Sequence, residues 1–178
     1  VLLLSIVEWV RIGFFPEVVF FMQENTEEKR RALDRAFRSL AARAHTEKEI
    51  VEKLTRAGYS EEAIAGAMET LTRYRLVDDA AYAESWVSAR AKRGIGPYRL
   101  QQELRRKGVS REDAQAALDT LDADDSLDAA ASFAAKRLKN DSPDEKRRAM
   151  QALLRRGYSF ETARAALERA LGGALEEE

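Results

Sequence analysis

The chain has 178 residues, of which 45% are hydrophobic and 34% charged, and its formal net charge is −1 at pH 7. This length suits one or two domains with a real core, and the composition is typical of a soluble helical protein. The chain contains no cysteine, which excludes disulfides, thiolate nucleophiles and thiolate metal sites and suits a reducing cytoplasm.

Residues 1–21 differ in character from the rest of the chain. They are apolar and β-branched, with Glu8, Arg11, Pro16 and Glu17 as interruptions. These interruptions disfavour a membrane span, which needs about 20 apolar residues. The segment also lacks the positive start and the small-residue end of a signal peptide. We expect an atypical N-terminal extension: an over-extended reading of a gene that starts at Met22, a strand or docking segment, or a membrane anchor.

Residues 22–77 form the first predicted repeat, which is helical from Thr26 onward. Thr46 and Glu49 make a capping box before its second helix, and Ser60 caps its third helix. Apolar residues at helical spacing predict three buried stripes. The stripes are Leu33, Phe37, Leu40, Ala41 and Ala44, then Ile50, Val51 and Leu54, and finally Ile64, Met68 and Leu71.

Residues 78–124 form the second predicted repeat, and Asp78 opens it. The Asp78 carboxylate suits an N-cap because it can accept a hydrogen bond from the free N–H groups of the first turn. Tyr82, Trp86 and Ala89 follow at helical spacing, so we expect one apolar face that carries all three. The aromatic pair is more typical of a core than of a base-stacking platform.

A second helix of this repeat begins at Pro97 and ends at Gly108. Gly94 and Gly96 interrupt the preceding helix, and Pro97 opens the next one where its missing N–H costs nothing. Leu100 and Leu104 carry the apolar stripe. Gly108 then suits the left-handed position just after a helix end, with Tyr98 exposed near the helix start.

Residues 125–172 form the third predicted repeat, followed by an acidic tail at 173–178. Its first helix, near 125–140, carries the stripe Leu127, Ala131, Ala134 and Leu138. A glycine with a serine two residues later recurs at Gly58, Gly108 and Gly157, with spacings of 50 and 49 residues. That period is natural for three helices per unit. The predicted fold is therefore all-α, an elongated array of three tandem three-helix repeats.

The strongest functional signal is a basic cluster in the second repeat. Between Arg90 and Arg111 the chain carries eight Lys or Arg residues and one acidic residue, Glu103. Such a field attracts phosphate or an acidic protein surface, whereas nothing in it reads base edges. We expect a partner-binding surface, with a merely solvated face as the alternative. Its candidate residues, including those of the third repeat, are Arg90, Lys92, Arg93, Tyr98, Arg99, Arg105, Arg106, Lys107, Lys146, Arg147, Arg155 and Arg156.

The geometry expected of this cluster is specific. Arg90, Arg93 and the arginines between Arg99 and Arg106 should lie largely exposed on one side, with Trp86 and Leu104 buried opposite. The caps and the apolar stripes have a structural role, but no structural need explains so many cations.

No combination of residues predicts catalysis, a cofactor or a metal site. His45 is the single histidine, and its place just before Thr46 suggests an ordinary turn residue. Asp78 and Asp79 are neighbours, and neighbouring helical side chains point about 100° apart, so helix capping explains them better than metal binding. We therefore expect a binding protein and not an enzyme.

A motif of a dozen positions runs through the second repeat. It reads Asp-Asp-x-x-Tyr-Ala, then an Arg, then Gly-Pro-x-x-Leu-x-x-Glu-Leu-x-x-x-Gly-Val. In this form it resembles the RecX family of regulatory proteins, and the flanking repeats extend the resemblance over roughly residues 25 to 171. The positions that carry it are Asp78, Asp79, Tyr82, Ala83, Arg90, Gly96, Pro97, Leu100, Glu103, Leu104, Gly108 and Val109.

The resemblance implies a cytoplasmic modulator of the RecA recombinase, with a place in homologous recombination, DNA repair and the SOS response. Such a protein binds the RecA–single-stranded DNA filament, lies in its helical groove and suppresses strand exchange, ATPase and coprotease activities. Single-stranded DNA would be met through the filament, with no membrane and no cofactor involved, and a monomer is expected. A nonspecific nucleic-acid-binding helical protein and a helical protein-interaction scaffold are the alternatives.

Overall fold

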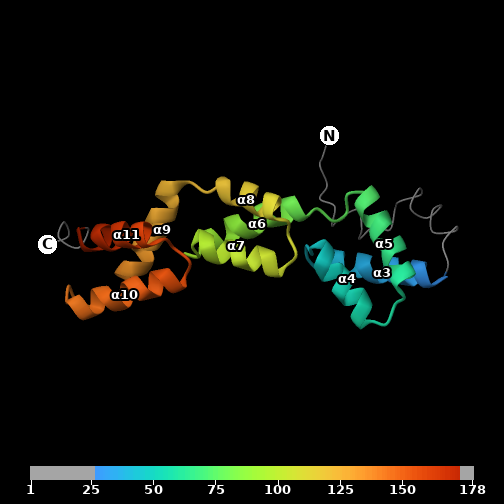
Figure 1. The fold of residues 1–178 in the computed structure, drawn as a ribbon, viewed down its shortest axis with the longest axis horizontal. Helices are drawn as coiled ribbons and strands as arrows, with labels where there is room; N and C mark the ends of the chain where they lie inside the picture. Colours follow the sequence, from blue (N-terminus) through green and yellow to red (C-terminus); the bar gives the residue numbers. More distant parts are fainter. Residues whose placement is uncertain (1–26, 173–178) are drawn as a thin grey trace. The chain divides into compact units, whose positions relative to one another are not determined.

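The computed structural model describes residues 27–172, and every regular element in that range is an α-helix (Figure 1). The predicted all-α fold class is confirmed. Residues 1–21 and 173–178, the predicted extension and acidic tail, lie outside the described residues. No helix between 27 and 172 is both long and apolar enough to cross a membrane. In chain order the helices are α3 (Glu27–Ala42), α4 (Glu47–Arg56), α5 (Glu61–Arg73), α6 (Asp79–Ala91), α7 (Pro97–Arg106), α8 (Arg111–Asp119), α9 (Ala123–Ala135), α10 (Pro143–Arg155) and α11 (Phe160–Gly172).

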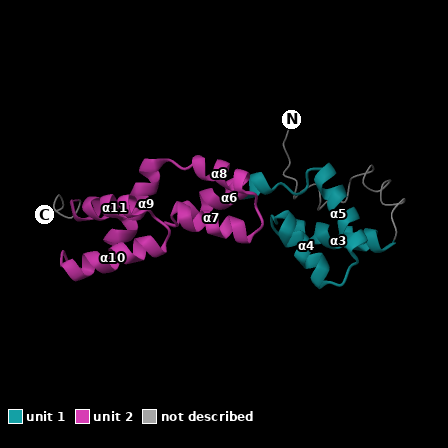
Figure 2. Cartoon of the chain, viewed as in Figure 1, with its two compact units in different colours: residues 1–82 teal, residues 83–178 magenta. Residues whose placement is uncertain are grey.

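The chain divides into two compact units, the first ending at Tyr82 and the second starting at Ala83 (Figure 2). The first unit holds α3, α4 and α5 together with the first turn of α6. The second unit holds the remainder of α6 and all of α7 to α11. The boundary therefore falls within one helix, and the second unit contains two sets of three helices.

The core of the first unit combines a few large side chains with several alanines. Ile50, Leu54 and Leu71 are almost completely enclosed, with 0–1% of their surface exposed. Phe37 and Met68 pack against this core while partly exposed. Because alanine side chains are short, they let the backbones of α3 and α5 approach closely and leave the large side chains to fill the centre. The other core residues are Ala32, Leu33, Ala36, Ala63, Ile64, Ala67 and Val77.

The apolar stripes predicted for α3 and α4 are correct only in part. Ala41 and Ala44 are exposed, and Ala44 lies beyond the end of α3. Val51 is 37% exposed, whereas Ile50 beside it is buried. Neighbouring helical residues point about 100° apart, so only one of two adjacent branched residues can face the core. On α3 the core face is centred earlier than predicted and includes Ala36.

The predicted N-caps form in the structure. Thr46 Oγ1 accepts a hydrogen bond from the N–H of Glu49 at 3.2 Å, and Asp78 Oδ1 accepts one from the N–H of residue 81 at 2.9 Å. Asp79 also takes part in helix capping, at the start of another helix. Its Oδ1 accepts a hydrogen bond from the N–H of Glu47 at 2.9 Å, so Asp79 satisfies a free N–H of the first turn of α4.

The three repeated glycines adopt the predicted left-handed backbone. Gly58, Gly108 and Gly157 have φ angles of 83°, 88° and 88°, and they follow α4, α7 and α10 respectively. Residues with a Cβ atom resist this conformation, whereas glycine adopts it freely. These glycines therefore end their helices and turn the chain toward the serine two residues later.

His45 lies in the turn before α4, as predicted, and is 2% exposed. Its Nδ1 lies 2.9 Å from the carbonyl oxygen of Arg43, and Lys53 Nζ lies 2.9 Å from its Nε2. A lysine ammonium can only donate, so Nε2 is the acceptor and the neutral ring carries its proton on Nδ1. Burial lowers the pKa of His45, and the neighbouring cations Arg43 and Lys53 lower it further, against the opposing effect of the Arg43 carbonyl.

We expect the first unit to lose stability as the pH falls below the ordinary histidine pKa of 6.5. The folded pKa lies below that of the unfolded chain, so acid protonates the unfolded state first. The contribution of neutral His45 is fully present above pH 6.5 and is lost as the pH falls toward the folded pKa. Urea unfolding of the parent and of His45→Gln across this range measures the effect. The variant should lack this part of the pH dependence. If the free energy of unfolding falls with pH equally steeply in both proteins, His45 is not its source.

The second unit has two neighbouring cores. Val87, Leu100 and Leu104 are fully buried among α6, α7 and α8. The α9–α11 core is built mainly from alanines around Leu153 and Tyr158, which are 0% and 3% exposed. Its other members are Ala130, Ala131, Ala134, Ala149, Ala163, Ala166 and Leu167.

The predicted apolar face of α6 is partly wrong. Tyr82 is buried as expected, but Ala89 is exposed and Trp86 is only half-buried. The buried side of α6 runs instead through Ala83 and Val87. The indole of Trp86 carries a polar N–H, and its partner, described below, keeps the ring at the edge of the core.

Candidate partner-binding surface

Helix α7 presents its arginines on the side opposite its core face. Leu100 and Leu104 are 0% exposed, whereas Arg99, Arg105 and Arg106 are all exposed. A helix turns every 3.6 residues, so residues one position before Leu100 and five or six positions after it fall away from the face that Leu100 and Leu104 share. The predicted exposure of these three arginines and the predicted burial of Leu104 are both confirmed.

Glu103 is the centre of a polar network that joins α6 to α7. Its Oε1 accepts hydrogen bonds from Arg90 Nη2 at 2.7 Å and from Arg99 Nε at 3.3 Å, and its Oε2 accepts one from Trp86 Nε1 at 3.2 Å. Burial by itself raises the pKa of Glu103, but the bonds from Arg90 and Trp86 outweigh burial and hold the pKa below its ordinary value. The one carboxylate of the basic cluster is therefore ionised and already neutralised.

Arg90 and Trp86 do not have the exposure that the sequence suggested. The Arg90 side chain is only 28% exposed, and its guanidinium carbon lies 5.0 Å from the centre of the Trp86 ring. Lys107 Nζ lies 4.3 Å from the same ring centre. Cations at these distances are attracted by the face of an indole. Arg90 and Lys107, both predicted partner-binding residues, thus contribute to the packing of α6 against α7.

Arg156, another predicted partner-binding residue, ties two parts of the second unit together. Its Nη1 donates hydrogen bonds to the carbonyl oxygens of Arg93 and Gly94, both at 2.8 Å. Its guanidinium carbon lies 3.9 Å from the centre of the Phe133 ring. Arg156 is thereby held on the turn that follows α6, while the side chains of Lys92 and Arg93 on that turn remain exposed.

The start of α7 and the end of α10 meet through two glycines. The N–H of Gly96 donates to the carbonyl of Arg156 at 2.8 Å, and the N–H of Tyr98 donates to the carbonyl of Gly157 at 3.1 Å. A Cβ atom on Gly96 would lie 2.4 Å from the carbonyl carbon of Gly157, and one on Gly157 would lie 2.4 Å from the backbone nitrogen of Arg99. Only glycine fits at these two positions, which fixes the placement of α7 beside the end of α10.

The cations predicted on the third repeat lie at opposite ends of α10. Lys146 and Arg147 lie near its start, paired with Asp141 at 2.6 Å and Asp144 at 2.8 Å. Arg155 is the last residue of the helix, exposed and next to α7. Nine helical residues separate it from Lys146, about 13 Å along the axis. The structure therefore brings Arg155 together with the α7 arginines and leaves Lys146 and Arg147 apart from them.

Two hollows run along α7 and share Gln102 and Arg106 as lining residues. The hollow toward α10 has a volume of about 290 Å³ and is lined by Tyr98, Arg99, Gln102, Glu103, Arg106, Leu154, Arg155 and Gly157. The hollow toward α8 has a volume of about 460 Å³ and is lined by Gln101, Gln102, Arg105, Arg106, Val109, Ser110, Arg111 and Ala114. We call the two together the basic track.

Sequence reasoning missed several residues of the basic track. Leu154 is 41% exposed beside the fully buried Leu153, and a pair of adjacent leucines does not reveal which of them faces the core. Gln101 and Gln102 carry no charge and gave no signal. Arg111 contributes to the charge imbalance but is not among the candidate residues, although its place beyond Gly108 puts it in the same hollow as Arg105.

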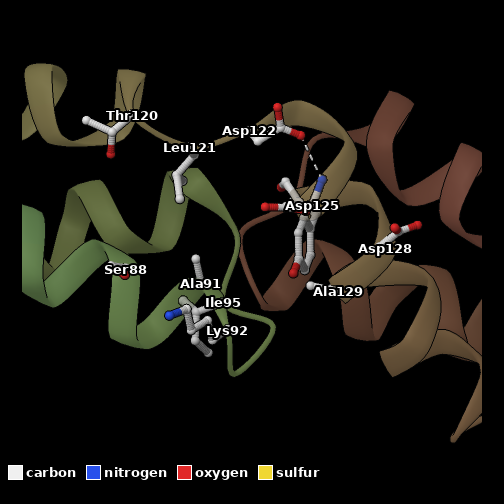
Figure 3. Close-up of a pocket in the computed structure, with 12 residues that line it drawn as sticks. Ser88, Ala91, Lys92, Ile95, Thr120, Leu121, Asp122, Asp125, Asp128 and Ala129 are labelled. Carbon is white, nitrogen blue, oxygen red and sulfur yellow. Dashed lines mark hydrogen bonds between the residues drawn. The ribbon is translucent and has the colours of Figure 1, made fainter.

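A third hollow, of about 360 Å³, lies between α6 and α9 (Figure 3). Its lining includes Lys92 and Ile95 from the turn that follows α6, and Asp122, Asp125 and Asp128 from α9 and the residue before it. Asp122 Oδ1 accepts a hydrogen bond from the N–H of Asp125 at 3.0 Å, the dashed line of Figure 3, and Asp128 is paired with Arg169 outside the hollow. Two of the three carboxylates therefore serve local structure. Among residues 27–172 no group of acidic residues and histidine could hold a metal.

Three family models match the chain, one for each set of three helices. They are described as the first, second and third three-helix domains of RecX, and they match residues 32–71, 78–118 and 123–167. Each match spans helices that the structure places together. The predicted tandem of three three-helix repeats is therefore confirmed.

Relatives and solved structures agree with these matches. The chain is 38% identical over 146 residues to the regulatory protein RecX of Mycobacterium sp. (strain KMS), covering 77% of this chain and 79% of the relative. It is 34% identical over 145 residues to the regulatory protein RecX of Prosthecochloris aestuarii, covering 81% of this chain and 96% of the relative. The crystal structure of RecX from Lactobacillus salivarius matches with a TM-score of 0.75 at 21% identity, covering 81% of this chain and 97% of that one, which shows the shared fold.

Proposed function

Because the chain belongs to the RecX family of regulatory proteins, we propose that it regulates the RecA recombinase by binding the RecA–single-stranded DNA filament through the basic track. The observation that carries this proposal is the row of exposed arginines on α7. Three of them, Arg99, Arg105 and Arg106, lie on one helix face, and the exposed Arg111 and Arg155 line the hollows beside that helix. The outcome of binding is a fall in strand exchange, ATPase and coprotease activity, with no catalysis by this chain.

The proposal requires that several of these cations face outward without a structural ion pair, although Arg99 is paired with Glu103. Within residues 27–172, Arg105, Arg111 and Arg155 take part in no ion pair. Exposed ion pairs between neighbours on one helix, such as Arg56 with Glu52 at 3.0 Å, stabilise the fold little. Arg105, Arg111 and Arg155 thus keep their charge available to an anionic partner.

The arrangement of the second unit also suits a repetitive partner. The glycine contact between α7 and α10 holds Arg155 at a fixed place beside Arg99. A filament offers the same anionic groups at a regular spacing, and several weak contacts held rigidly in register add up to a strong one. Release of the protein from the filament would then require all of these contacts to break together.

Binding to RecA filaments compared with the same single strand in bare form, at equal salt, tests the proposed function. We expect tighter binding to the filament, together with a fall in its rate of ATP hydrolysis as the protein is added. Equal binding to both, with no change in ATP hydrolysis, would instead indicate a nonspecific nucleic-acid-binding protein. Binding to neither would indicate a scaffold with a solvated basic face.

A further inference from the structure

We propose that the third hollow, between α6 and α9, binds an alkylammonium ion, with the carboxylate of Asp125 and the hydroxyl of Tyr158 as its polar contacts. The ion belongs either to a free aliphatic amine or to a lysine side chain of another protein. This site goes beyond the proposed function, because its lining shares no residue with the basic track. A buried hydroxyl, a carboxylate without an ion pair and apolar walls carry the inference.

The hydroxyl of Tyr158 is buried and has no hydrogen-bond partner in the fold. Tyr158 is 3% exposed and lines the hollow, and its hydroxyl makes no hydrogen bond to any group of residues 27–172. Burial raises the pKa of Tyr158, against an opposing effect of Arg156, so the hydroxyl keeps its proton at neutral pH. Buried polar groups normally have a partner, and the hollow is the space from which a ligand can supply one.

The other two repeats show that folding does not require this hydroxyl. Tyr158 directly follows the repeated glycine of the third repeat, and Tyr59 and Val109 hold the same place in the first and second. Tyr59 donates a hydrogen bond to the carbonyl of Arg31 at 3.2 Å, so its hydroxyl serves the first unit. Val109 has no hydroxyl and is 5% exposed, so an apolar residue also fills this place. Packing of the repeat therefore does not explain the hydroxyl of Tyr158.

Asp125 supplies the negative charge for the ligand. Its side chain is exposed and takes part in no ion pair or hydrogen bond within the described range 27–172. Of the other two carboxylates, Asp122 caps the first turn of α9 through its Oδ1, and Asp128 is paired with Arg169. The Asp125 carboxylate is thus free to accept a hydrogen bond from an ammonium ion, and such charged hydrogen bonds are stronger than neutral ones.

The walls of the hollow suit an aliphatic stem. Ala91, Ile95, Leu121 and Ala129 line it, and its volume is about 360 Å³. An apolar lining with a few polar groups is typical of a site for a small organic molecule. The lining comes from both the second and the third repeat, so a bound aliphatic chain would bridge these two repeats.

Lys92 is the cation among the lining residues, and it defines the main alternative. It is exposed and forms no ion pair within the part of the chain from 27 to 172. Figure 3 shows Lys92 on the α6 side of the hollow and the aspartates on the α9 side. Because a lysine side chain is long and flexible, it can turn into solvent and leave Asp125 to a cationic ligand. The alternative is a carboxylate ligand that binds through Lys92.

The test uses the full chain and three probes with the same four-carbon stem: n-butylamine, 1-butanol and butyrate. Each probe is titrated at neutral pH while the backbone amide signals of the protein are followed by NMR. The variants are Asp125→Asn, Tyr158→Phe and, as a matched control, Asp124→Asn. Asp124 is exposed in the same first turn of α9 but does not line the hollow. A Gly-Lys-Gly peptide with blocked ends is compared with n-butylamine to identify the source of the ion.

We expect n-butylamine to shift the amide signals of the residues that line the hollow, and 1-butanol and butyrate to bind at least about tenfold more weakly. Asp125→Asn should weaken n-butylamine binding at least about fivefold, and Tyr158→Phe about two- to fivefold. Asp124→Asn should bind it like the parent. Tyr158→Phe should be at least as stable as the parent in thermal unfolding, because the lost hydroxyl has no partner in the fold.

The inference is overturned if n-butylamine shifts no signal of the hollow, if butyrate or 1-butanol binds as tightly, or if Asp124→Asn weakens binding as much as Asp125→Asn does. Loss of stability in Tyr158→Phe with unchanged amine binding would also overturn it, because the hydroxyl would then serve the fold. Binding of the peptide supports the site and, where it is tighter than that of n-butylamine, identifies a lysine of a partner protein as the source. Tighter binding of n-butylamine supports the site and identifies a free amine.

Discussion

Gly96→Ala is expected to lower the free energy of unfolding of the second unit by about 3 kcal/mol, although it adds one methyl group and changes no charge. The backbone of Gly96, with φ −78° and ψ 160°, is ordinary for alanine, so the substitution brings no conformational penalty. The cost arises because the new Cβ would lie 2.4 Å from the carbonyl carbon of Gly157. Relief of that clash requires α7 to move away from the end of α10 and to lose the two hydrogen bonds between them.

Two further glycines provide matched comparisons for this prediction. Gly58 has φ 83° but nothing within 4 Å of an added Cβ, so Gly58→Ala should cost only the left-handed backbone, about 1 kcal/mol. Gly157 combines φ 88° with a clash of 2.4 Å against the nitrogen of Arg99, so Gly157→Ala should cost the most. Urea unfolding measures how much stability each of the three variants loses. Hydrogen exchange reports this loss for each unit separately. A neutral Gly96→Ala would show that the two backbones do not meet.

Gly96→Ala should also weaken filament binding, although no arginine is removed. The glycine contact places Arg155 and Leu154 beside Tyr98 and Arg99, and separation of α7 from α10 would divide the basic track. Binding is therefore expected to depend on the geometry of the second unit as well as on its charge.

The second large effect is expected when Arg99, Arg105 and Arg106 are changed together to alanine. Filament binding should weaken on the order of 10- to 100-fold at physiological salt, and the salt dependence should flatten as fewer counterions are released. Stability should change little, because all three side chains are exposed and Glu103 retains its bonds from Arg90 and Trp86. Thermal unfolding checks this second expectation.

The matched control removes three arginines from the same unit at other places. Arg137, Arg148 and Arg164 are exposed and line neither hollow of the basic track. Their joint change to alanine alters the net charge by the same amount. If this control weakens filament binding as much as the α7 variant does, net charge and not the basic track determines binding.

Local features of this fold could be predicted from the sequence because each depends on a few neighbouring residues. The caps at Thr46 and Asp78 follow from side chains that can reach the free N–H groups of the next turn. The positive φ of Gly58 and Gly157 follows from the recurrence of glycine between a basic helix end and a serine cap. The all-α class follows from helical spacing repeated along the chain.

The errors in the predicted surface come from contacts between distant residues. Trp86 has the spacing of a core residue, yet the bond from its N–H to Glu103 and the two cations over its ring keep it half-buried. In the sequence, Arg156 cannot be told apart from a surface cation. The fold shows that it donates hydrogen bonds to the carbonyls of Arg93 and Gly94, more than sixty residues away. Charge counting locates a basic cluster but does not separate cations that serve the fold from those that face a partner.

Binding of the parent, the α7 triple-alanine variant and the control triple-alanine variant to RecA–single-stranded DNA filaments, titrated side by side at physiological salt, tests the central claim most directly. The account predicts that the parent and the control bind alike and that the variant lacking Arg99, Arg105 and Arg106 binds on the order of 10- to 100-fold more weakly while remaining folded. Equal binding by all three proteins would contradict the claim, because the arginines of α7 would then be a solvated face with no part in recognition of the filament.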